Sequence, residues 1–328
     1  MKNMYLAVTF GILVLTGCNS NEYGGPDYSG VKAEIWGDIN TPQTRYHGVE
    51  WSPGESIGVS VIKGDVGSTN VQYQFTGDKE HPFTAIGGDR NAIYIKGNGI
   101  AALTAYYPYS GINGINGMIS INTNSENQTM ANQALIDCLF AEATATRENP
   151  QVMFRFNHRL SQLCLNFEYE NGSKPTDVSY TLKNIVTKGF FNTEDGKTEL
   201  LETSSEETSN SEDINIDVMN PSMVSTLVLL PQEIAQATIE VIANGVFYST
   251  TIDNITLENN KQHSYTVELG SDSSQITIKK NDTTEWQPGN GGEATSKPDA
   301  PDTDASFGSS QWGEGQEDQD IKSESESI

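Results

Sequence analysis

The clearest indication of the fold class is the stretch Val152-Met153-Phe154-Arg155-Phe156, near the middle of this 328-residue chain. Bulky apolar side chains stand at every second position of it. A little further along, Leu163-Cys164-Leu165-Asn166-Phe167 repeats the pattern. Successive side chains of an extended strand point to opposite faces, so this spacing turns one apolar face toward a core. The two stretches therefore predict two β-strands that each cover a hydrophobic core.

The same alternation recurs from about residue 31 to about residue 280. It is found at residues 57–61, 71–75, 214–218 and 265–269, and Gly, Asn, Asp and Ser separate the runs, as hairpin turns require. No amphipathic helix of 12 or more residues stands out, although residues 130–140 suit a short helix or turn. Many short strands at this spacing predict an all-β protein built from β-sandwiches.

The length of the strand-forming region indicates two sandwiches in tandem. About 250 residues are generous for one sandwich and natural for two. The best break is the polar, proline-containing stretch at residues 168–178. We therefore predict an N-terminal β-sandwich over residues 31–172 and a C-terminal β-sandwich over residues 173–284.

The charge balance excludes several functional classes. Acidic residues outnumber basic ones 44 to 19, which gives a net charge of −25. A nucleic-acid partner requires a stripe of Lys and Arg to neutralise phosphates, and a polybasic membrane-surface protein requires a similar excess. Three Cys and four His are too few and too scattered for a zinc module or a disulfide scaffold.

The first 18 residues predict export and a lipid anchor. Lys2 precedes an apolar run over residues 5–16, which is shorter than the ~20 residues that span a bilayer and has the length of a signal-peptide core. The run ends in Leu15-Thr16-Gly17-Cys18, which resembles the bacterial lipobox. Cleavage there would free Cys18 to carry acyl chains such as palmitate, which hold a protein at a membrane. The alternative is an ordinary secretory cleavage site with an incidental Cys.

Two polar segments flank the predicted sandwiches. Residues 19–30 form a short leash, and the Asn at position 19 favours the outer membrane over the inner one. Residues 285–328 contain 11 acidic residues and 2 Lys. Such a composition cannot bury enough apolar surface to offset the entropy of ordering, so we predict a disordered acidic tail.

A series of short motifs resembles one family of bacterial surface proteins. The series consists of Thr44-Arg45, Trp51-Ser-Pro-Gly-Glu-Ser-Ile-Gly-Val59, Ala105-Tyr-Tyr-Pro-Tyr109, Phe156-Asn-His-Arg-Leu160, Leu230-Pro-Gln232 and Lys261-Gln-His-Ser-Tyr265. Their order and their position behind a lipobox resemble the fimbrillin-like lipoproteins, the subunits of type V pili. The resemblance covers roughly residues 33–286, and the acidic tail departs from it.

The resemblance implies a fold and an assembly mechanism. Members of this family have two transthyretin-like β-sandwiches, and a trypsin-like protease cuts after an Arg near the start of the first one. That position corresponds here to Arg45, with the cut before Tyr46. The strand that would leave carries Val31, Ala33 and Ile35, and the groove left behind would accept a strand of the next subunit. The alternative for Arg45 is an ordinary surface residue in a loop.

Two further expectations for the C-terminal region rest on the same resemblance. Ile276 and Ile278, in the run Gln275-Ile276-Thr277-Ile278, are the candidate donor strand. Asp282-Thr283-Thr284 fits a pattern for O-glycosylation, with Thr283 as the acceptor. The long tail behind such a donor strand argues against a simple stalk subunit, so a tip or accessory role is as well supported as a stalk role.

The sequence offers no candidate catalytic or metal-binding residue and implies no cofactor. Residues 54–58 match the G-x-S-x-G pattern of serine hydrolases, but a strand follows where that chemistry requires a helix. His158 is expected to be a hydrogen-bonded structural residue, and the glycine-rich residues 111–117 a flexible loop. Residues 299–304 lack the Gly and Glu of a calcium loop. Cys138 and Cys164 are left open as a disulfide or as two buried thiols.

The sequence therefore predicts a non-enzymatic subunit of a cell-surface fimbria, held at the outer membrane by lipid and partnered by other pilin subunits. The alternative is a surface lipoprotein that never polymerises and binds glycan. The partners considered with either function include a host or bacterial surface glycan or protein. Exposed aromatic side chains could stack on sugars in that case, although core packing is the commoner use of such residues. The candidates for stacking are Trp36, Trp51, Tyr106, Tyr107 and Tyr109.

Overall fold

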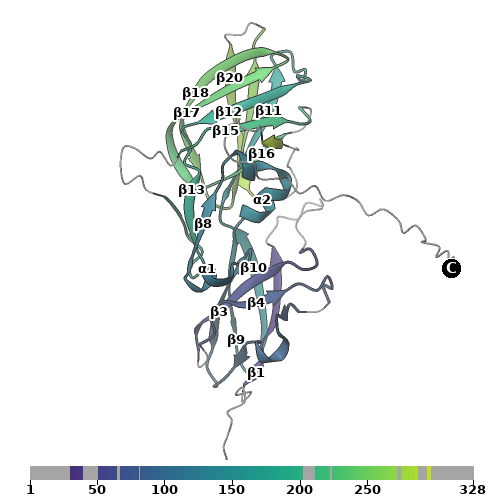
Figure 1. Ribbon diagram of the computed structural model, residues 1–328, viewed down its shortest axis with the longest axis vertical. Helices are drawn as coiled ribbons and strands as arrows, with labels where there is room; N and C mark the ends of the chain where they lie inside the picture. The colour runs from purple at the N-terminus through teal and green to yellow at the C-terminus, as the bar shows by residue number, and fades with distance from the viewer. Residues whose placement is uncertain are drawn as a thin grey trace, which may run out of the picture.

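The computed structural model describes residues 30–39, 51–64, 67–80, 82–201, 211–221, 224–271, 275–286 and 294–296. These residues form an all-β fold, as the sequence predicts, with only short helical segments. Figure 1 shows two β-rich lobes along the long axis, with the first strand at the free end of one lobe. The predicted signal peptide, lipobox and leash fall on residues 1–30, and of these only Gly30 is described.

The first lobe is built on a seven-stranded sheet with the order β2-β10-β9-β7-β3-β4-β5. Its strands are β2 (Glu34–Ile39), β3 (Ser56–Lys63), β4 (Val71–Gln74), β5 (Thr84–Ala85), β7 (Ala101–Tyr107), β9 (Leu139–Ala145) and β10 (Gln151–His158). A separate pair joins β1 (Val31–Lys32) to β6 (Tyr94–Ile95). Alternate residues of these strands, such as Val152, Phe154 and Phe156, face a shared hydrophobic core. The fold class therefore follows directly from the period-two pattern.

The second lobe packs a four-stranded sheet, β16-β11-β19-β20, against a five-stranded sheet, β18-β17-β12-β15-β21. The first sheet contains β11 (Ser161–Tyr169), β16 (Ser225–Leu229), β19 (Lys261–Leu269) and β20 (Ile276–Glu285). The second contains β12 (Val178–Lys183), β15 (Ile214–Val218), β17 (Gln232–Ala243), β18 (Val246–Leu257) and β21 (Ala294–Ser296). Leu165 and Phe167 from one sheet and Tyr180 and Ile239 from the other lie in one core. This is the face-to-face packing of a sandwich.

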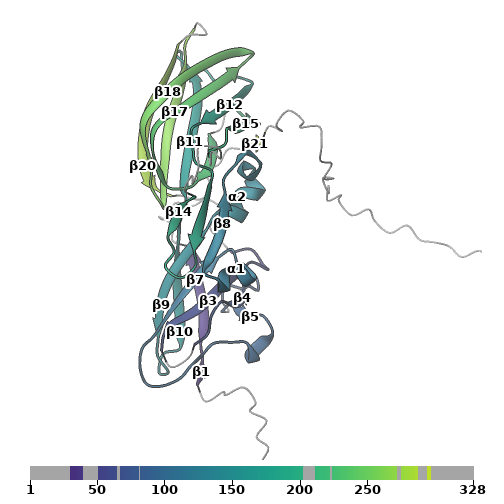
Figure 2. The ribbon, with the colours of Figure 1, turned by 60° about the vertical axis from the view of Figure 1, so that its left-hand side comes forward.

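A small sheet joins the lobes. It contains β8 (Met118–Asn122), β13 (Lys188–Asn192) and β14 (Thr198–Leu200), and β13 pairs with both of the others. In Figures 1 and 2, β8 lies between the lobes. A third hydrophobic cluster, which includes Tyr106, Leu160, Phe191 and Trp286, is buried at this junction. The junction is therefore held by side chains that lie far apart in the chain.

The helical segments are short. They are η1 (Gly88–Arg90), α1 (Gly111–Ile115), η2 (Ser125–Gln128) and α2 (Met130–Ile136). The predicted short helix near residue 130 is confirmed, and it begins where the Thr129 hydroxyl accepts a hydrogen bond from the Asn132 amide at 3.2 Å. The prediction of a flexible loop at residues 111–117 is wrong, because α1 forms there. A Cβ on Gly114 would lie 1.9 Å from the Tyr106 hydroxyl, so close packing requires glycine.

The predicted tail begins too early. Glu285 closes β20, and Trp286 is buried at the junction. Residues 294–296 form β21, which pairs antiparallel with β15. The remaining residues of the predicted tail lie outside the described part of the chain.

The predicted division at residues 172 and 173 stays a prediction. β11 precedes this point, yet it pairs with β16 and β19, which follow it. The chain therefore contributes to the core of the second lobe from Leu163 onward, which is before the predicted boundary.

Candidate functional site

The candidate site is the edge of the first sheet that β2 occupies. β2 pairs with β10 in parallel, with Glu34 opposite Gln151 and Ile39 opposite Phe156. Antiparallel neighbours can be joined by a two-residue hairpin, whereas parallel neighbours cannot. The sheet therefore holds β2 through hydrogen bonds and side chains and not through a tight turn to its partner strand.

The second edge of β2 is also anchored. The Phe83 amide donates to the Ile35 carbonyl at 2.7 Å, and the Trp51 indole Nε1 donates to the Gly37 carbonyl at 2.7 Å. One residue before β2, the Ala33 amide donates to the Ile93 carbonyl at 2.9 Å. A strand in this position is therefore bonded along both sides, and its removal would leave buried donors without acceptors.

The three residues predicted to leave differ in how deeply their side chains are buried. Val31 is half-buried and pairs with Ile95, whereas Ala33 is 3% exposed and Ile35 is fully buried. Ile35 and Ala33 belong to the core of the first lobe. Full burial of an Ile side chain contributes roughly 1.5–3 kcal/mol. The segment therefore completes a core, and whether it leaves remains a prediction.

Four aromatic rings cluster around Trp51, whose indole binds the Gly37 carbonyl, and we call them the aromatic cage: Trp51, Phe83, Tyr107 and Phe156. The Trp51 ring centroid lies 5.4 Å from Phe83, 5.4 Å from Tyr107 and 5.2 Å from Phe156, each in an edge-to-face arrangement. The Tyr107 hydroxyl donates to Glu55 at 2.9 Å, and burial raises the pKa of Tyr107. These contacts hold the rings in place.

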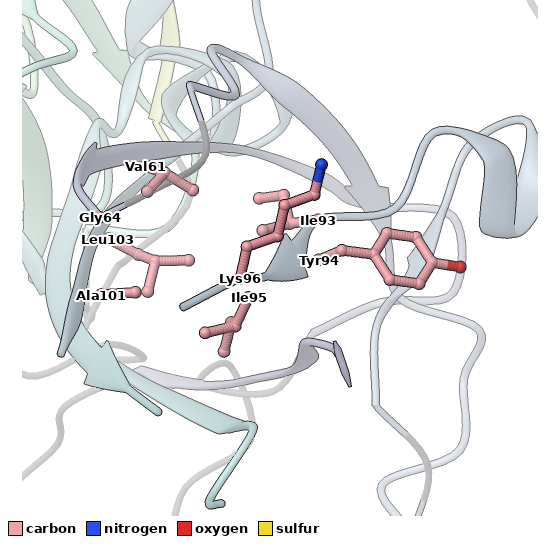
Figure 3. Close-up of a pocket in the computed structure, with 8 residues that line it drawn as sticks. All are labelled: Val61, Gly64, Ile93, Tyr94, Ile95, Lys96, Ala101 and Leu103. Atoms are coloured by element: carbon pink, nitrogen blue, oxygen red, sulfur yellow. The ribbon is translucent and has the colours of Figure 1, made fainter. Parts of the chain in front are cut away.

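A small hollow lies next to the pairing of β1 with β6. Its volume is about 10 Å³, which is room for about one water molecule. Figure 3 shows Val61, Ile95 and Leu103 pointing into the same space, while the Tyr94 ring points away. The hollow is therefore too small to take a further side chain.

The candidate donor strand is itself the edge of a sheet. β20 pairs with β19, with Ile276 opposite Leu269 and Ile278 opposite Val267. Both isoleucines are partly buried against the core of the second lobe. Most of the other side chains of β20 that the structure describes are exposed.

The end of β20 is fixed at the junction. Trp286 is 3% exposed, and its indole stacks on the His158 ring at 4.2 Å and 7°. His158 Nδ1 lies 2.9 Å from both carboxylate oxygens of Asp137. The expectation that His158 is a hydrogen-bonded structural residue is confirmed.

Thr283, the candidate glycosylation acceptor, lies on the exposed surface of β20. It stands opposite His263, and its hydroxyl lies 3.4 Å from His263 Nδ1. His263 Nε2 accepts a hydrogen bond from the Glu258 amide at 3.0 Å. Burial lowers the pKa of His263 below its ordinary value of 6.5. Modification of Thr283 remains a prediction.

The two cysteines left open by the sequence are free, buried thiols. Burial raises the pKa of the Cys164 thiol to about 12, and burial also raises the pKa of Cys138. The thiolate is the reactive form of cysteine, so both side chains are inert near neutral pH.

The serine of the G-x-S-x-G pattern begins a strand. Gly54 has φ 95°, and Ser56 is the first residue of β3. The Gln72 side-chain amide donates to the Ser56 hydroxyl at 3.2 Å. A strand therefore follows the turn, as the sequence predicts.

The aromatic residues considered for sugar stacking are buried or half-buried. Trp51 and Tyr106 are buried, and the Tyr106 hydroxyl donates to the Asn70 side chain at 2.7 Å. Trp36, Tyr107 and Tyr109 are half-buried. Core packing therefore accounts for Trp51 and Tyr106.

Sequence reasoning missed Gly37 and Phe83 as parts of the site. The available signal was a glycine at an inward position of an alternating strand, which often marks close approach by another group. It could not name Phe83, because the contact joins residues far apart in the chain. Cys18, Arg45 and Tyr46 lie outside the described residues.

Within the described residues, no group of three or more His, Cys, Asp or Glu side chains is placed to hold a metal ion. Over that same part of the chain, no helix has the length and apolar character needed to cross a membrane.

Comparison with known proteins identifies the family. Residues 44–286 match the sequence profile of the fimbrillin-like family, so this chain belongs to that family. It is similar to a proposed cell adhesion protein of Bacteroides ovatus, with 28% identity, a TM-score of 0.67, and coverage of 79% of this chain and 98% of the other. A proposed cell adhesion protein of Bacteroides uniformis shares the fold, with 16% identity, a TM-score of 0.61, and coverage of 78% and 99%. Among curated proteins, none matches the sequence.

Proposed function

We propose that this chain is a subunit of a bacterial cell-surface fimbria, in a stalk, tip or accessory position, and that it assembles by strand exchange. The observation that carries the proposal is the placement of Ala33 and Ile35. They complete the core of the first lobe from an edge strand whose neighbour is parallel. Membership of the fimbrillin-like family supports the role, and so does the likeness to the Bacteroides ovatus protein.

Cleavage after Arg45 would detach the segment that carries β1 and β2. Its departure would expose the edge of β10 and the cavity that Ile35 fills, and would free the Phe83 amide and the Trp51 indole. Unpaired buried donors and exposed apolar side chains are both unfavourable. A strand from a neighbouring subunit would restore the hydrogen bonds and refill the pockets. The same groove would thus drive polymerisation.

The remaining parts of the proposal concern location and chemistry. Lipid on Cys18 would hold the uncut chain at the outer membrane until the protease acts. We propose a structural role and not a catalytic one. Glycan capture by a non-polymerising lipoprotein is the weaker alternative, since the Trp51 and Tyr106 rings are buried and cannot stack on a sugar.

A reversible disulfide between β1 and β6 tests the proposal. Lys32 and Tyr94 are directly opposite in an antiparallel pair, where Cα atoms are about 4.5–5.5 Å apart, a separation that suits a disulfide. In the double variant Lys32→Cys/Tyr94→Cys, we expect oxidised protein trimmed by trypsin to stay monomeric. Reduction should restore the SDS-resistant ladders that the trimmed wild-type chain forms together with the other subunits of its fibre.

The single variants Lys32→Cys and Tyr94→Cys are the matched controls and should polymerise with or without reductant. Lys32 forms an exposed ion pair with Asp89 at 2.8 Å, and loss of such a pair typically costs less than about 1 kcal/mol. Ladders of equal strength from the oxidised and reduced double variant would show that assembly does not require β1 to leave.

A further inference from the structure

The groove under β2 is tight at position 37, where a side chain would press against two aromatic rings. An ideal Cβ on Gly37 would lie 3.0 Å from Cε2 of Phe156 and 3.5 Å from Cε2 of Phe83. Phe156 is fully buried, and the Trp51 ring packs edge-to-face with it, with 5.2 Å between the ring centroids. Close-packed interiors have few voids, so the Phe156 ring cannot move aside without disturbing the aromatic cage.

The inward-facing positions before Gly37 show which other residues the groove accepts. Ile35, two residues earlier, fills a fully buried position, and Ala33 is a small buried residue two further back. Successive side chains of a strand alternate, so these three positions share the inward face. The Trp51 indole binds the carbonyl of residue 37. The groove therefore accepts a small residue, a large apolar residue and a glycine at every second position.

We infer that the strand that fills this groove after cleavage comes from a different protein subunit, one that carries a glycine two positions from a large apolar residue. By the same geometry, the C-terminal segments of this chain do not fill the groove of a second copy. The inference rests on the proposed strand exchange and adds the choice of partner to it. It makes the chain one component of a mixed fibre.

The candidate donor strand of this chain does not meet the glycine requirement. A strand can enter parallel or antiparallel to β10, with either Ile276 or Ile278 in the position of Ile35. These four registers place Lys280, Ile278, Ile276 or Ser274 at position 37. Each of these residues has a Cβ, which at this position would lie 3.0 Å from the Phe156 ring, and three of them add a longer side chain to a site that is already tight. Overpacking of this kind weakens binding.

The remaining C-terminal residues also fail. Within residues 287–328, no glycine has a large apolar residue two positions away on either side. The segment Trp312-Gly313-Glu314 resembles Trp36-Gly37-Asp38 of β2, but it would put Gln311 into the fully buried position of Ile35. A buried amide without a hydrogen-bonding partner is costly.

Competition among labelled peptides tests the inference on the full chain nicked after Arg45, with its own N-terminal segment still bound. The peptide of residues 30–40 should displace that segment, and the same peptide with Asp38→Val should do so equally, because residue 38 is exposed. The peptide with Gly37→Val should bind at least about tenfold more weakly. Peptides of residues 275–285 and 305–316 should not displace it. Displacement by either would overturn the inference and leave strand exchange standing.

The intact, uncut chain provides a measurement that needs no exchange. There, Gly37→Val should lower the unfolding midpoint by about 4–8 °C, while Asp38→Val should change it by less than about 2 °C. Equal midpoints for the two variants would overturn the glycine requirement. If Gly37→Val is destabilising but the peptide of residues 30–40 never enters the nicked chain, the proposed strand exchange fails, and with it the inferred partner.

Discussion

β2 and β20 are both edge strands, yet they are held in different ways. β2 is bonded along both sides, and its Ile35 is fully buried in the core of the first lobe. β20 pairs with β19 on one side, and its isoleucines are only partly buried. The strand predicted to leave is thus the one more deeply built into its lobe. A lobe that loses such a strand has a strong driving force to replace it, which is what an assembly groove requires.

The largest contrast is expected from a charge placed on the inward face of each strand. Ile35→Asp would bury an unpaired carboxylate and should destabilise the first lobe by more than about 4 kcal/mol. Ile278→Asp is the matched change on a partly exposed position and should cost about 1–2 kcal/mol. Denaturant unfolding of the uncut chain measures both. Equal losses would remove the distinction between the two strands.

A smaller effect is expected where β20 ends. Trp286→Ala would remove a buried indole that stacks on His158, and we expect a loss of about 3 kcal/mol. The matched control is Thr284→Ala, on an exposed position of β20, which should change stability by less than about 0.5 kcal/mol. If the two variants unfold alike, Trp286 does not hold β20 at the junction.

The smallest effect concerns the pH dependence of the contact between β19 and β20. The pKa of His263 is lowered in the folded chain by burial, so below about pH 6.5 the unfolded chain binds more protons at this residue than the folded chain. This contribution to stability is complete above pH 6.5 and is lost as the pH falls. His263→Gln should therefore flatten the fall of the unfolding free energy between pH 6.5 and 5. Parallel curves for variant and wild type would contradict this assignment.

The strands were predictable because their signal is local. Residues 214–218 form β15 as the alternation indicates, and the same holds for the alternating core of β10. The buried positions of β2 also follow from its pattern. Local pattern could not show that Phe83 and Phe156 enclose Gly37, because that contact depends on how distant segments pack.

Local composition gave a wrong prediction at two places, and the physical reason is the same in both. The residues 111–117 are rich in glycine, which indicates a loop, yet Gly114 is needed for close packing against Tyr106 within α1. Trp286 follows directly on a polar strand, but its burial depends on His158 in the other half of the chain. Tertiary contacts override local preference in both cases.

The most direct measurement is the N-terminal sequence, by mass spectrometry, of this chain recovered from cell-surface filaments. We predict that the polymerised chain begins at Tyr46 and lacks the segment with Ala33 and Ile35. Filament-borne chains that still carry residues 18–45 in full would contradict the release of β1 and β2 and would require another mode of assembly.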